Sequence, residues 1–259
     1  MKGIEKFSLK DKVAFVTGGA RGIGKAVATG FAEAGAHIVI ADLDVEEGQK
    51  TAAALAAENG VRTLAVKTDV TKPESVADLI ATIDREFGHL DIAFCNAGIC
   101  INAPAKDMTY EQWSKVININ LTGVFLTAQA AGKYMIDKSI KGSIINTASM
   151  SAHIVNVPQP QCAYNASKAG VIQLTKSLAI EWAAFGVRVN SISPGYIGTE
   201  LVKASPTLIP LIDKWNAMAP MHRLGDPTEL QTVTLYLASD ASSFTTGSDV
   251  IVDGAFTCF

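Results

Sequence analysis

A tyrosine and a lysine placed four residues apart, Tyr164 and Lys168, are of types that can transfer a proton together. They fall within residues 163–185, a stretch of helical composition, so both side chains should lie on one face of a helix. An ammonium group beside a phenol favours the phenolate, which makes the phenol a better base. Such pairs also occur on ordinary helix surfaces, so the surrounding motifs decide whether this pair is catalytic.

Three further groups of polar and small residues come directly after expected strands. Asn96-Ala97-Gly98 follows the fourth expected strand and Pro194-Gly195 follows the sixth. Ser151 lies just past the fifth strand and 13 residues before Tyr164. Because the carboxyl ends of parallel strands meet at one edge of a sheet, these residues are expected to gather there.

A glycine-rich segment, residues 17–24, joins the first expected strand to the first expected helix. Glycines let the chain turn tightly and approach a pyrophosphate, and the helix N-terminus offers free N–H groups. Gly19, Gly24 and Lys25 also match the spacing of a nucleoside-triphosphatase loop, which requires a serine or threonine next to hold Mg²⁺. Ala26 has no ligand at that position, so the segment is interpreted as a dinucleotide loop.

An acidic residue, Asp42, ends the second expected strand, 18 residues after Gly24. A carboxylate at that place can accept hydrogen bonds from both adenosine ribose hydroxyls and repels a 2′-phosphate, which favours NAD over NADP. Arg21 argues the other way, because a basic residue in the loop could pair with that phosphate. The carboxylate would be the closer charge, so we expect NAD as the cofactor.

Apolar runs alternate with helical stretches along the whole chain. The strands are expected at residues 13–17, 37–41, 62–66, 90–95, 142–148, 187–192 and 249–252. The helices are expected at residues 22–34, 45–59, 73–87, 110–137 with a break near Gly123, 163–185 and 227–239. Continuous apolar strands, each followed by a helix, predict an α/β fold with a doubly wound parallel seven-stranded sheet, a Rossmann fold joined by right-handed crossovers. No linker or repeat divides the sequence, so residues 1–259 are expected to form a single domain.

Together these motifs resemble those of the short-chain dehydrogenase/reductase family, from Leu9 to Gly254. Each motif alone is modest, but their order is very specific. The set comprises the glycine loop, Asp69, Asn96-Ala97-Gly98, Asn120, Ser151, Tyr164 with Lys168, and Pro194-Gly195. The resemblance implies an enzyme that interconverts an alcohol and a ketone.

Catalytic roles follow from this resemblance. Tyr164 is implied as the general acid/base, its pKa lowered from about 10 by Lys168 and by the cationic nicotinamide ring. Lys168 would also hold the nicotinamide ribose, and Ser151 would hydrogen-bond the substrate oxygen. Asn120 would hold a water that connects Lys168 to solvent, with Asn118 the less favoured candidate for that role.

The resemblance also implies the residues that bind the cofactor. Those for the pyrophosphate and the adenosine half are Gly18, Arg21, Gly22, Ile23, Gly24, Asp42, Asp69, Val70, Asn96 and Gly98. Those for the nicotinamide half are Pro194, Gly195, Ile197 and Thr199, together with Tyr164 and Lys168. The hydride chemistry would belong to the cofactor, while the protein orients it and manages one proton.

Two segments should select the substrate, the one after Ser151 and a lid at about residues 196–225. The first is rich in hydrogen-bonding side chains, among them His153 and Asn156, and it resembles the sugar-alcohol branch of the family. We therefore expect a pentitol or hexitol and its ketose as substrates, bound by Ser151, His153, Asn156 and Tyr164. The alternatives are another carbonyl, such as a keto-gluconate or 3-oxoacyl compound, or a non-catalytic NAD sensor.

Composition excludes other classes of function. The net charge is −3 with scattered basic residues, so no nucleic-acid partner is expected. No apolar run approaches the roughly 18 residues that span a bilayer, and residues 1–12 lack the apolar core of a signal peptide, so a cytoplasmic location is expected. The 4 cysteines form no zinc pattern, and no metal is expected. Family resemblance suggests a homotetramer in which helices 110–137 and 163–185 pair between subunits.

Overall fold

Parallel strands in the order β3-β2-β1-β4-β5-β6-β7 form one 7-stranded sheet in the computed structural model, which describes residues 3–258. The strands are β1 (Val13–Thr17), β2 (His37–Asp42), β3 (Thr63–Lys67), β4 (Ile92–Cys95), β5 (Ser143–Thr147), β6 (Arg188–Pro194) and β7 (Asp249–Val252). The predicted doubly wound parallel sheet is confirmed. Residues 1, 2 and 259 of the predicted domain lie outside the described residues.

Both faces of the sheet are covered, which explains why its central strands are apolar throughout. Every residue of β1, β4 and β5 is buried. Side chains alternate along β1, with Ala14 and Val16 in one apolar cluster and Val13 and Phe15 in the other. Each cluster is closed by helices, and this two-sided burial holds the strand ends in register at the edge of the sheet.

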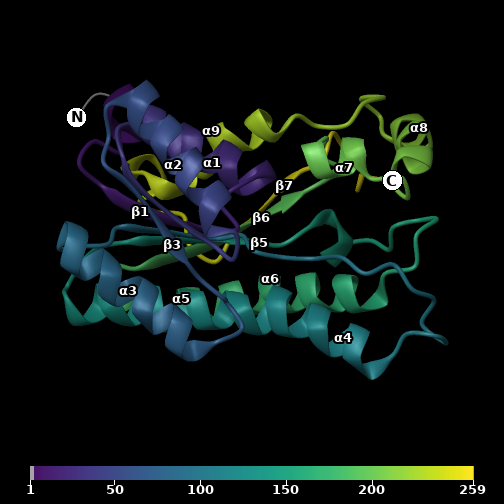
Figure 1. Cartoon of the computed structure of the whole chain (residues 1–259), viewed down its shortest axis with the longest axis horizontal. Coiled ribbons are helices and arrows are strands. Elements are labelled where there is room, and N and C mark those ends of the chain that lie inside the picture. The colour runs from purple at the N-terminus through teal and green to yellow at the C-terminus, as the bar shows by residue number, and fades with distance from the viewer. Residues whose placement is uncertain (1–2, 259) are drawn as a thin grey trace.

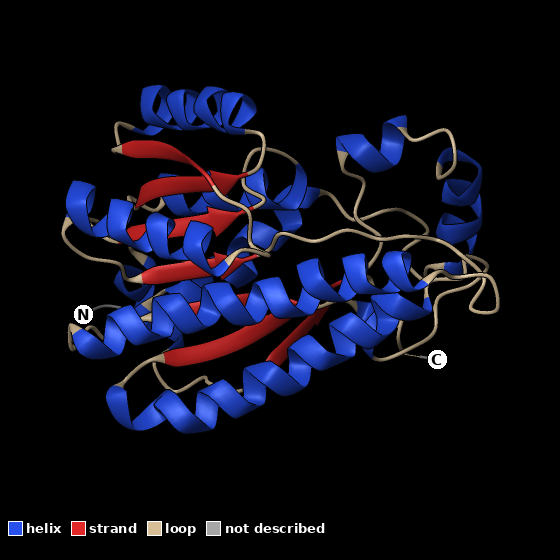
Figure 2. Cartoon of the chain, turned by 60° about the horizontal axis from the view of Figure 1, so that its bottom comes forward, coloured by secondary structure: helices blue, strands red, loops and turns tan. Residues whose placement is uncertain are grey.

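The helices form one layer on each face, as Figures 1 and 2 show. One layer contains α1 (Gly22–Glu33), α2 (Val45–Asn59) and α9 (Gln231–Ala238). The other contains α3 (Pro73–Phe87), α4 (Tyr110–Ile117), α5 (Gly123–Asp137) and α6 (Cys162–Trp182). In the second layer α5 and α6 lie side by side, and Phe125 and Ile180 are exposed. The pairing of subunits through these helices stays a prediction.

The predicted break near Gly123 is a π-helical turn, Asn118–Thr122, between α4 and α5. A Cβ atom at Gly123 would lie 2.7 Å from Cγ2 of Val70, so the helix can approach the loop after β3 only with glycine there. The turn also buries Asn120 completely. Such π turns often occur at functional sites, because they redirect a side chain within a helix.

The connection from β6 to β7 departs from the predicted right-handed pattern. Its helix α9 packs against α1, on the face opposite α6, although β5, β6 and β7 follow one another across the sheet. This crossover is therefore left-handed. The long connection makes this possible, because it first leaves the sheet to form α7 (Glu200–Ala204) and α8 (Ile209–Met218) within the predicted lid segment.

Candidate active site

The loops after β1 and β4 are joined by hydrogen bonds from Asn96. Its side-chain Nδ2 donates to the main-chain oxygen of Thr17 at 3.0 Å, and its main-chain N–H donates to Thr17 Oγ1 at 2.8 Å. Thr147, the last residue of β5, donates to Asn96 Oδ1 at 3.4 Å. The predicted cofactor residue Asn96 thus ties three strand ends together and stiffens the glycine loop.

The glycine loop leaves space that side chains would fill. A Cβ atom at Gly24 would lie 2.1 Å from the main-chain oxygen of Gly18, so only glycine allows this tight turn into α1. Gly22 has φ +57°, and the contacts that a Cβ atom there would make are with Thr199, at 3.5 and 3.7 Å. Thr199 therefore lies across the loop from the N-terminus of α1. This bare N-terminus fits a pyrophosphate group.

Asp42 lies at the end of β2 with its carboxylate facing the glycine loop. Its oxygens accept hydrogen bonds from the main-chain N–H groups of Ala20, at 3.0 Å, and Asp44, at 3.1 Å. Arg21 forms ion pairs with Asp44 at 2.8 Å and Glu47 at 3.6 Å. The positive charge of Arg21 is thus already opposed by carboxylates within the chain.

The loop after β3 carries the residues predicted at the adenine. Asp69 accepts hydrogen bonds from the Thr71 hydroxyl at 2.7 Å and from its N–H at 2.9 Å, which hold the pKa of Asp69 below its usual range. Val70 packs on Gly123 of α5. Asp69 therefore shapes this loop, and Val70 anchors it to the neighbouring helix.

Tyr164 and Lys168 lie on the same face of α6, as predicted. Lys168 Nζ lies 5.6 Å from the centre of the Tyr164 ring and donates to the main-chain oxygen of Thr147 at 2.6 Å. Burial lowers the pKa of Lys168 to about 8. Burial also raises the pKa of Tyr164 to about 12, while a hydrogen bond with Ser149 acts in the opposite direction. In the chain alone, burial thus outweighs the lowering of the Tyr164 pKa that was expected from Lys168.

Asn120 is brought to this pair by the π-helical turn. Its Oδ1 accepts from the N–H of Ile99 at 2.8 Å, and its Nδ2 donates to the Ile99 oxygen at 2.8 Å. A Cβ atom at Gly98 would lie 3.3 Å from Asn120 Oδ1 and 3.5 Å from Lys168 Nζ. Gly98 therefore leaves a small space between the amide and the ammonium group.

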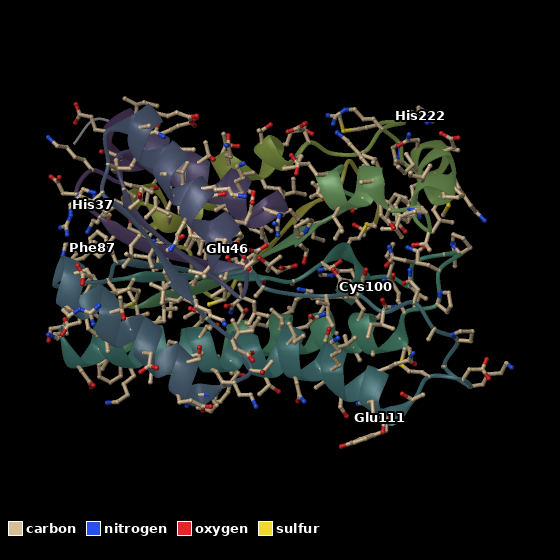
Figure 3. All side chains as sticks on the ribbon, in the orientation of Figure 1. His37, Glu46, Phe87, Cys100, Glu111 and His222 are labelled. Carbon is tan, nitrogen blue, oxygen red and sulfur yellow. The ribbon has the colours of Figure 1, made fainter. Side chains whose placement is uncertain are left out.

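A cavity of about 620 Å³ opens beside Tyr164 at the carboxyl edge of the sheet. Figure 3 shows one of its lining residues, Cys100, well away from the edge of the molecule at which His37 and Phe87 lie. Predicted site residues that line the cavity are Ile23, Ser151, Asn156, Tyr164, Gly195, Ile197 and Thr199. The lid closes over it, and the two ends of the lid are joined where Gly225 N–H donates to the Tyr196 oxygen at 2.9 Å. The volume is in the usual range for a small-molecule site.

A family model described as enoyl-(acyl carrier protein) reductase matches residues 18–257, a range that contains the glycines of the glycine loop, Tyr164 and Lys168. The chain is a short-chain dehydrogenase/reductase. Its fold and its family thus agree with the resemblance, and the enzyme is an oxidoreductase that acts on an alcohol or a ketone.

Curated relatives of this short-chain dehydrogenase/reductase include enzymes named for sugar alcohols and ketoses. A probable NADP-dependent mannitol dehydrogenase of Yarrowia lipolytica is 46% identical over 98% of this chain and 91% of its own. A sorbose reductase of Candida albicans is 45% identical over 98% of this chain and 90% of its own. The solved structure of a short-chain type dehydrogenase/reductase from Mycobacterium marinum has a TM-score of 0.96 and 44% identity, and covers 100% of both chains.

Two serines of this dehydrogenase/reductase, Ser149 and Ser151, line the cavity beside Tyr164. The Ser149 hydroxyl donates to Ser151 Oγ at 3.1 Å. Ser151 Oγ in turn donates to Asn156 Oδ1 and accepts from Gln161 Nε2 at 3.2 Å. Ser151 is the predicted site residue, and Ser149 was not among the predicted residues. The position of Ser149 directly after Ala148, at the end of the fifth strand, was the available signal.

His153 is not brought to the cavity, contrary to its prediction as a substrate contact. Its Nε2 lies 2.8 Å from Asp249 Oδ2, and its ring also lies near Ser193 on β6. Asp249 begins β7, so the carboxylate draws the imidazole toward the sheet instead of toward Tyr164. Neither His153 nor Asp249 lines the cavity beside Tyr164.

Asn156 does line the cavity, but its amide is already engaged. Its Oδ1 accepts from Ser151, and its Nδ2 donates to the Tyr196 hydroxyl at 3.0 Å. With 3% of its surface exposed, Asn156 positions its neighbours more than it offers new hydrogen bonds to a substrate. The predicted contact of Asn156 with a substrate hydroxyl stays a prediction.

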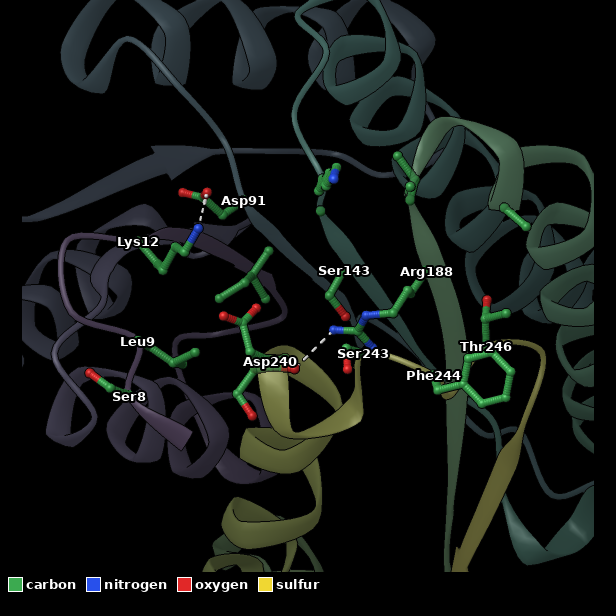
Figure 4. A pocket seen from close by; sticks show the side chains of 18 residues that line it. Ser8, Leu9, Lys12, Asp91, Ser143, Arg188, Asp240, Ser243, Phe244 and Thr246 are labelled. Atoms are coloured by element: carbon green, nitrogen blue, oxygen red, sulfur yellow. Dashed lines mark hydrogen bonds and ion pairs between the residues drawn. The ribbon is translucent and has the colours of Figure 1, made fainter. Parts of the chain in front are cut away.

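A second cavity, of about 600 Å³, lies at the amino edge of the sheet (Figure 4). Three of its charged residues have partners within the chain, since Lys12 binds Asp91 at 3.0 Å and Arg188 donates to the oxygens of Leu237 and Ser239. None of the predicted site residues lines it. In the described chain no group of three His, Cys, Asp or Glu residues could hold a metal, and no described helix is long and apolar enough to cross a membrane.

Proposed function

We propose that this chain interconverts a neutral polyol and its ketose with NAD(H). The observation that carries the proposal is the lining of the cavity beside Tyr164, which contains hydroxyl and amide side chains and no Asp, Glu, Lys or Arg among the described residues. A sugar acid or a phosphorylated substrate would call for an opposing charge, since a buried anion without a partner is unfavourable. A neutral chain of hydroxyl groups matches these donors and acceptors.

Side chains beside the cavity carry out the proton-transfer steps. Tyr164 accepts the proton of the substrate alcohol during oxidation and returns it during reduction. Ser151, which lines the cavity, turns its hydroxyl from Asn156 to the substrate oxygen. A bound nicotinamide would accept or donate the hydride at the substrate carbon.

Lys168 and Asn120 support Tyr164 from within the fold. The Lys168 ammonium favours the phenolate form of Tyr164. Because its pKa is about 8, Lys168 remains mostly protonated at neutral pH and assists Tyr164 as a base. Asn120 Oδ1 has a second lone pair facing the space that Gly98 leaves beside Lys168. A water in that space would connect the ammonium group to solvent, as the sequence prediction requires.

The proposed activity predicts a clear order among substrates. With NAD⁺, the enzyme should oxidise a pentitol or hexitol far better than a secondary alcohol of equal chain length that lacks the other hydroxyls. A site built to hydrogen-bond hydroxyl groups loses partners when they are missing, and such sites discriminate strongly. Steady-state rates at 340 nm across matched polyols and deoxygenated alcohols measure this order. A better rate with the deoxygenated alcohol would contradict the polyol substrate but not the oxidoreductase activity.

NAD(H) is proposed as the cofactor because of the charges around the adenosine ribose site. Asp42 would repel a 2′-phosphate, and the ion pairs of Arg21 with Asp44 and Glu47 reduce its attraction for one. Because some relatives are named NADP-dependent, the preference for NAD⁺ over NADP⁺ has to be measured. In this chain the balance of charge beside the loop is acidic, so NAD⁺ should be preferred.

Replacing Asp42 with alanine is expected to narrow the preference for NAD⁺ over NADP⁺ by at least about tenfold, because a like charge beside the phosphate is removed. The measurement is the ratio of kcat/KM for the two cofactors. Glu46→Ala is the matched control, since it removes an exposed carboxylate from the first turn of α2. An unmodified enzyme that uses both cofactors equally would contradict the role of Asp42.

A further inference from the structure

Tyr196 is a cavity residue that lies outside the predicted acid/base and cofactor sets. It follows Gly195 directly after β6, at the beginning of the lid, and its ring is held by two aromatic neighbours. The ring stacks on Trp215 of α8, with centroids 4.1 Å apart and an angle of 10°, and it meets Phe256 edge to face at 5.3 Å. This packing fixes the direction in which the hydroxyl projects.

The hydroxyl oxygen of Tyr196 receives two hydrogen bonds. Gln159 Nε2 donates to it at 2.8 Å, and Asn156 Nδ2 donates to it at 3.0 Å. Both amides also line the cavity beside Tyr164. The oxygen of Tyr196 therefore faces this cavity, while its ring packs against Trp215 and Phe256.

The orientation of the Gln159 amide is set by Trp215. An indole N–H can only donate, and Trp215 Nε1 lies 3.3 Å from Gln159 Oε1. The carbonyl end of Gln159 is therefore turned to the indole, which leaves its NH₂ group for Tyr196. A flipped amide would place two donors against each other.

The orientation of the Asn156 amide is set by Ser151 in the same way. Gln161 Nε2 donates to Ser151 Oγ at 3.2 Å, as does Ser149 Oγ at 3.1 Å, so the proton of Ser151 is directed to Asn156 Oδ1. The NH₂ group of Asn156 is then left for Tyr196. Two independent chains of hydrogen bonds thus present donors to the same phenol oxygen.

With both amides donating, Tyr196 has its own proton left to give. Among residues 3–258 no side-chain or main-chain acceptor takes it. Burial raises the pKa of Tyr196, so the phenol keeps this proton at neutral pH. A buried hydroxyl donor facing a cavity is favourable only if a ligand or water accepts from it.

We propose that Tyr196 donates a hydrogen bond to a substrate hydroxyl oxygen beyond the reacting carbon, and so determines specificity for polyols and ketoses. The inference rests on the proposed function and adds the residue that recognises the hydroxyl. Gln159 and Asn156 are positioning residues that force Tyr196 to act as a donor. Trp215 couples this recognition to the lid, because it holds both the ring of Tyr196 and the amide of Gln159.

The test combines Tyr196→Phe with a series of monodeoxy analogues of the ketose that the unmodified enzyme reduces best. The variant removes only the hydroxyl, so stacking on Trp215 and packing on Phe256 are preserved. For the unmodified enzyme, loss of one particular hydroxyl from the ketose should lower kcat/KM about tenfold, the upper range for one neutral hydrogen bond. Tyr196→Phe should lower kcat/KM for the full ketose by the same factor and should no longer discriminate against that one analogue.

Tyr110→Phe, which alters a tyrosine with 78% of its surface exposed, serves as the control and should leave all ratios unchanged. NADH binding, followed by fluorescence, should be equal in both variants and the unmodified chain. An equal loss for Tyr196→Phe on the ketose and every analogue, or no loss at all, would overturn the role of Tyr196 while leaving the proposed function intact. An unmodified enzyme that reduces simple ketones but no ketose would overturn both.

Discussion

Tyr164→Phe is expected to lower turnover by at least about 10²-fold, because the change removes the acid/base hydroxyl and leaves the ring in place. Apart from its hydroxyl, the ring of Tyr164 offers the site no group that could donate or accept a proton. Steady-state turnover with the best polyol and NAD⁺ measures the loss. A rate within a few-fold of the parent enzyme would contradict the proposed mechanism.

NADH should still bind to Tyr164→Phe, because the glycine loop and Lys168 are unchanged. Lys168 keeps its bond to the Thr147 oxygen, which does not depend on the tyrosine hydroxyl. Fluorescence titration with NADH therefore serves as the control for folding. A variant that binds NADH normally and turns over slowly separates the loss of a proton acceptor from the loss of structure.

The serines are expected to differ sharply when each is replaced with alanine. Ser151→Ala should lower kcat by about 10²-fold or more, the range for removing one donor aimed at a reacting oxygen. Ser149→Ala should lower it by less than about tenfold, because its hydroxyl donates to Ser151 and acts through it. Turnover of the two variants, with equal NADH affinity as the check on folding, measures the difference.

The reverse order would assign the substrate oxygen to Ser149. Ser149→Thr adds a further control, since it keeps the hydroxyl that donates to Ser151. If Ser149 only positions Ser151, the threonine variant should recover part of the rate lost in Ser149→Ala. No recovery, together with a loss as large as that of Ser151→Ala, would contradict the role of Ser151.

The sequence by itself determined the regular local geometry of helices and strands. The spacing of Tyr164 and Lys168 placed both on one face of α6, because helix periodicity depends on neighbouring residues only. Continuous apolar runs identified the buried parallel strands, since both faces of such a sheet are covered. The break near Gly123 could also be expected from the sequence and corresponds to the π-helical turn.

Side-chain partners in irregular segments were decided only by the tertiary structure. Ser149 and Ser151 lie in a turn without a repeating geometry, so the sequence could not show that one hydroxyl donates to the other. His153 turns to Asp249, which is 96 positions away in the sequence. Tyr196 becomes a donor only because Trp215 and Ser151 orient two amides from outside. Such contacts join segments that are far apart in the chain, and their geometry follows from how the lid and the loop after β5 pack on the sheet.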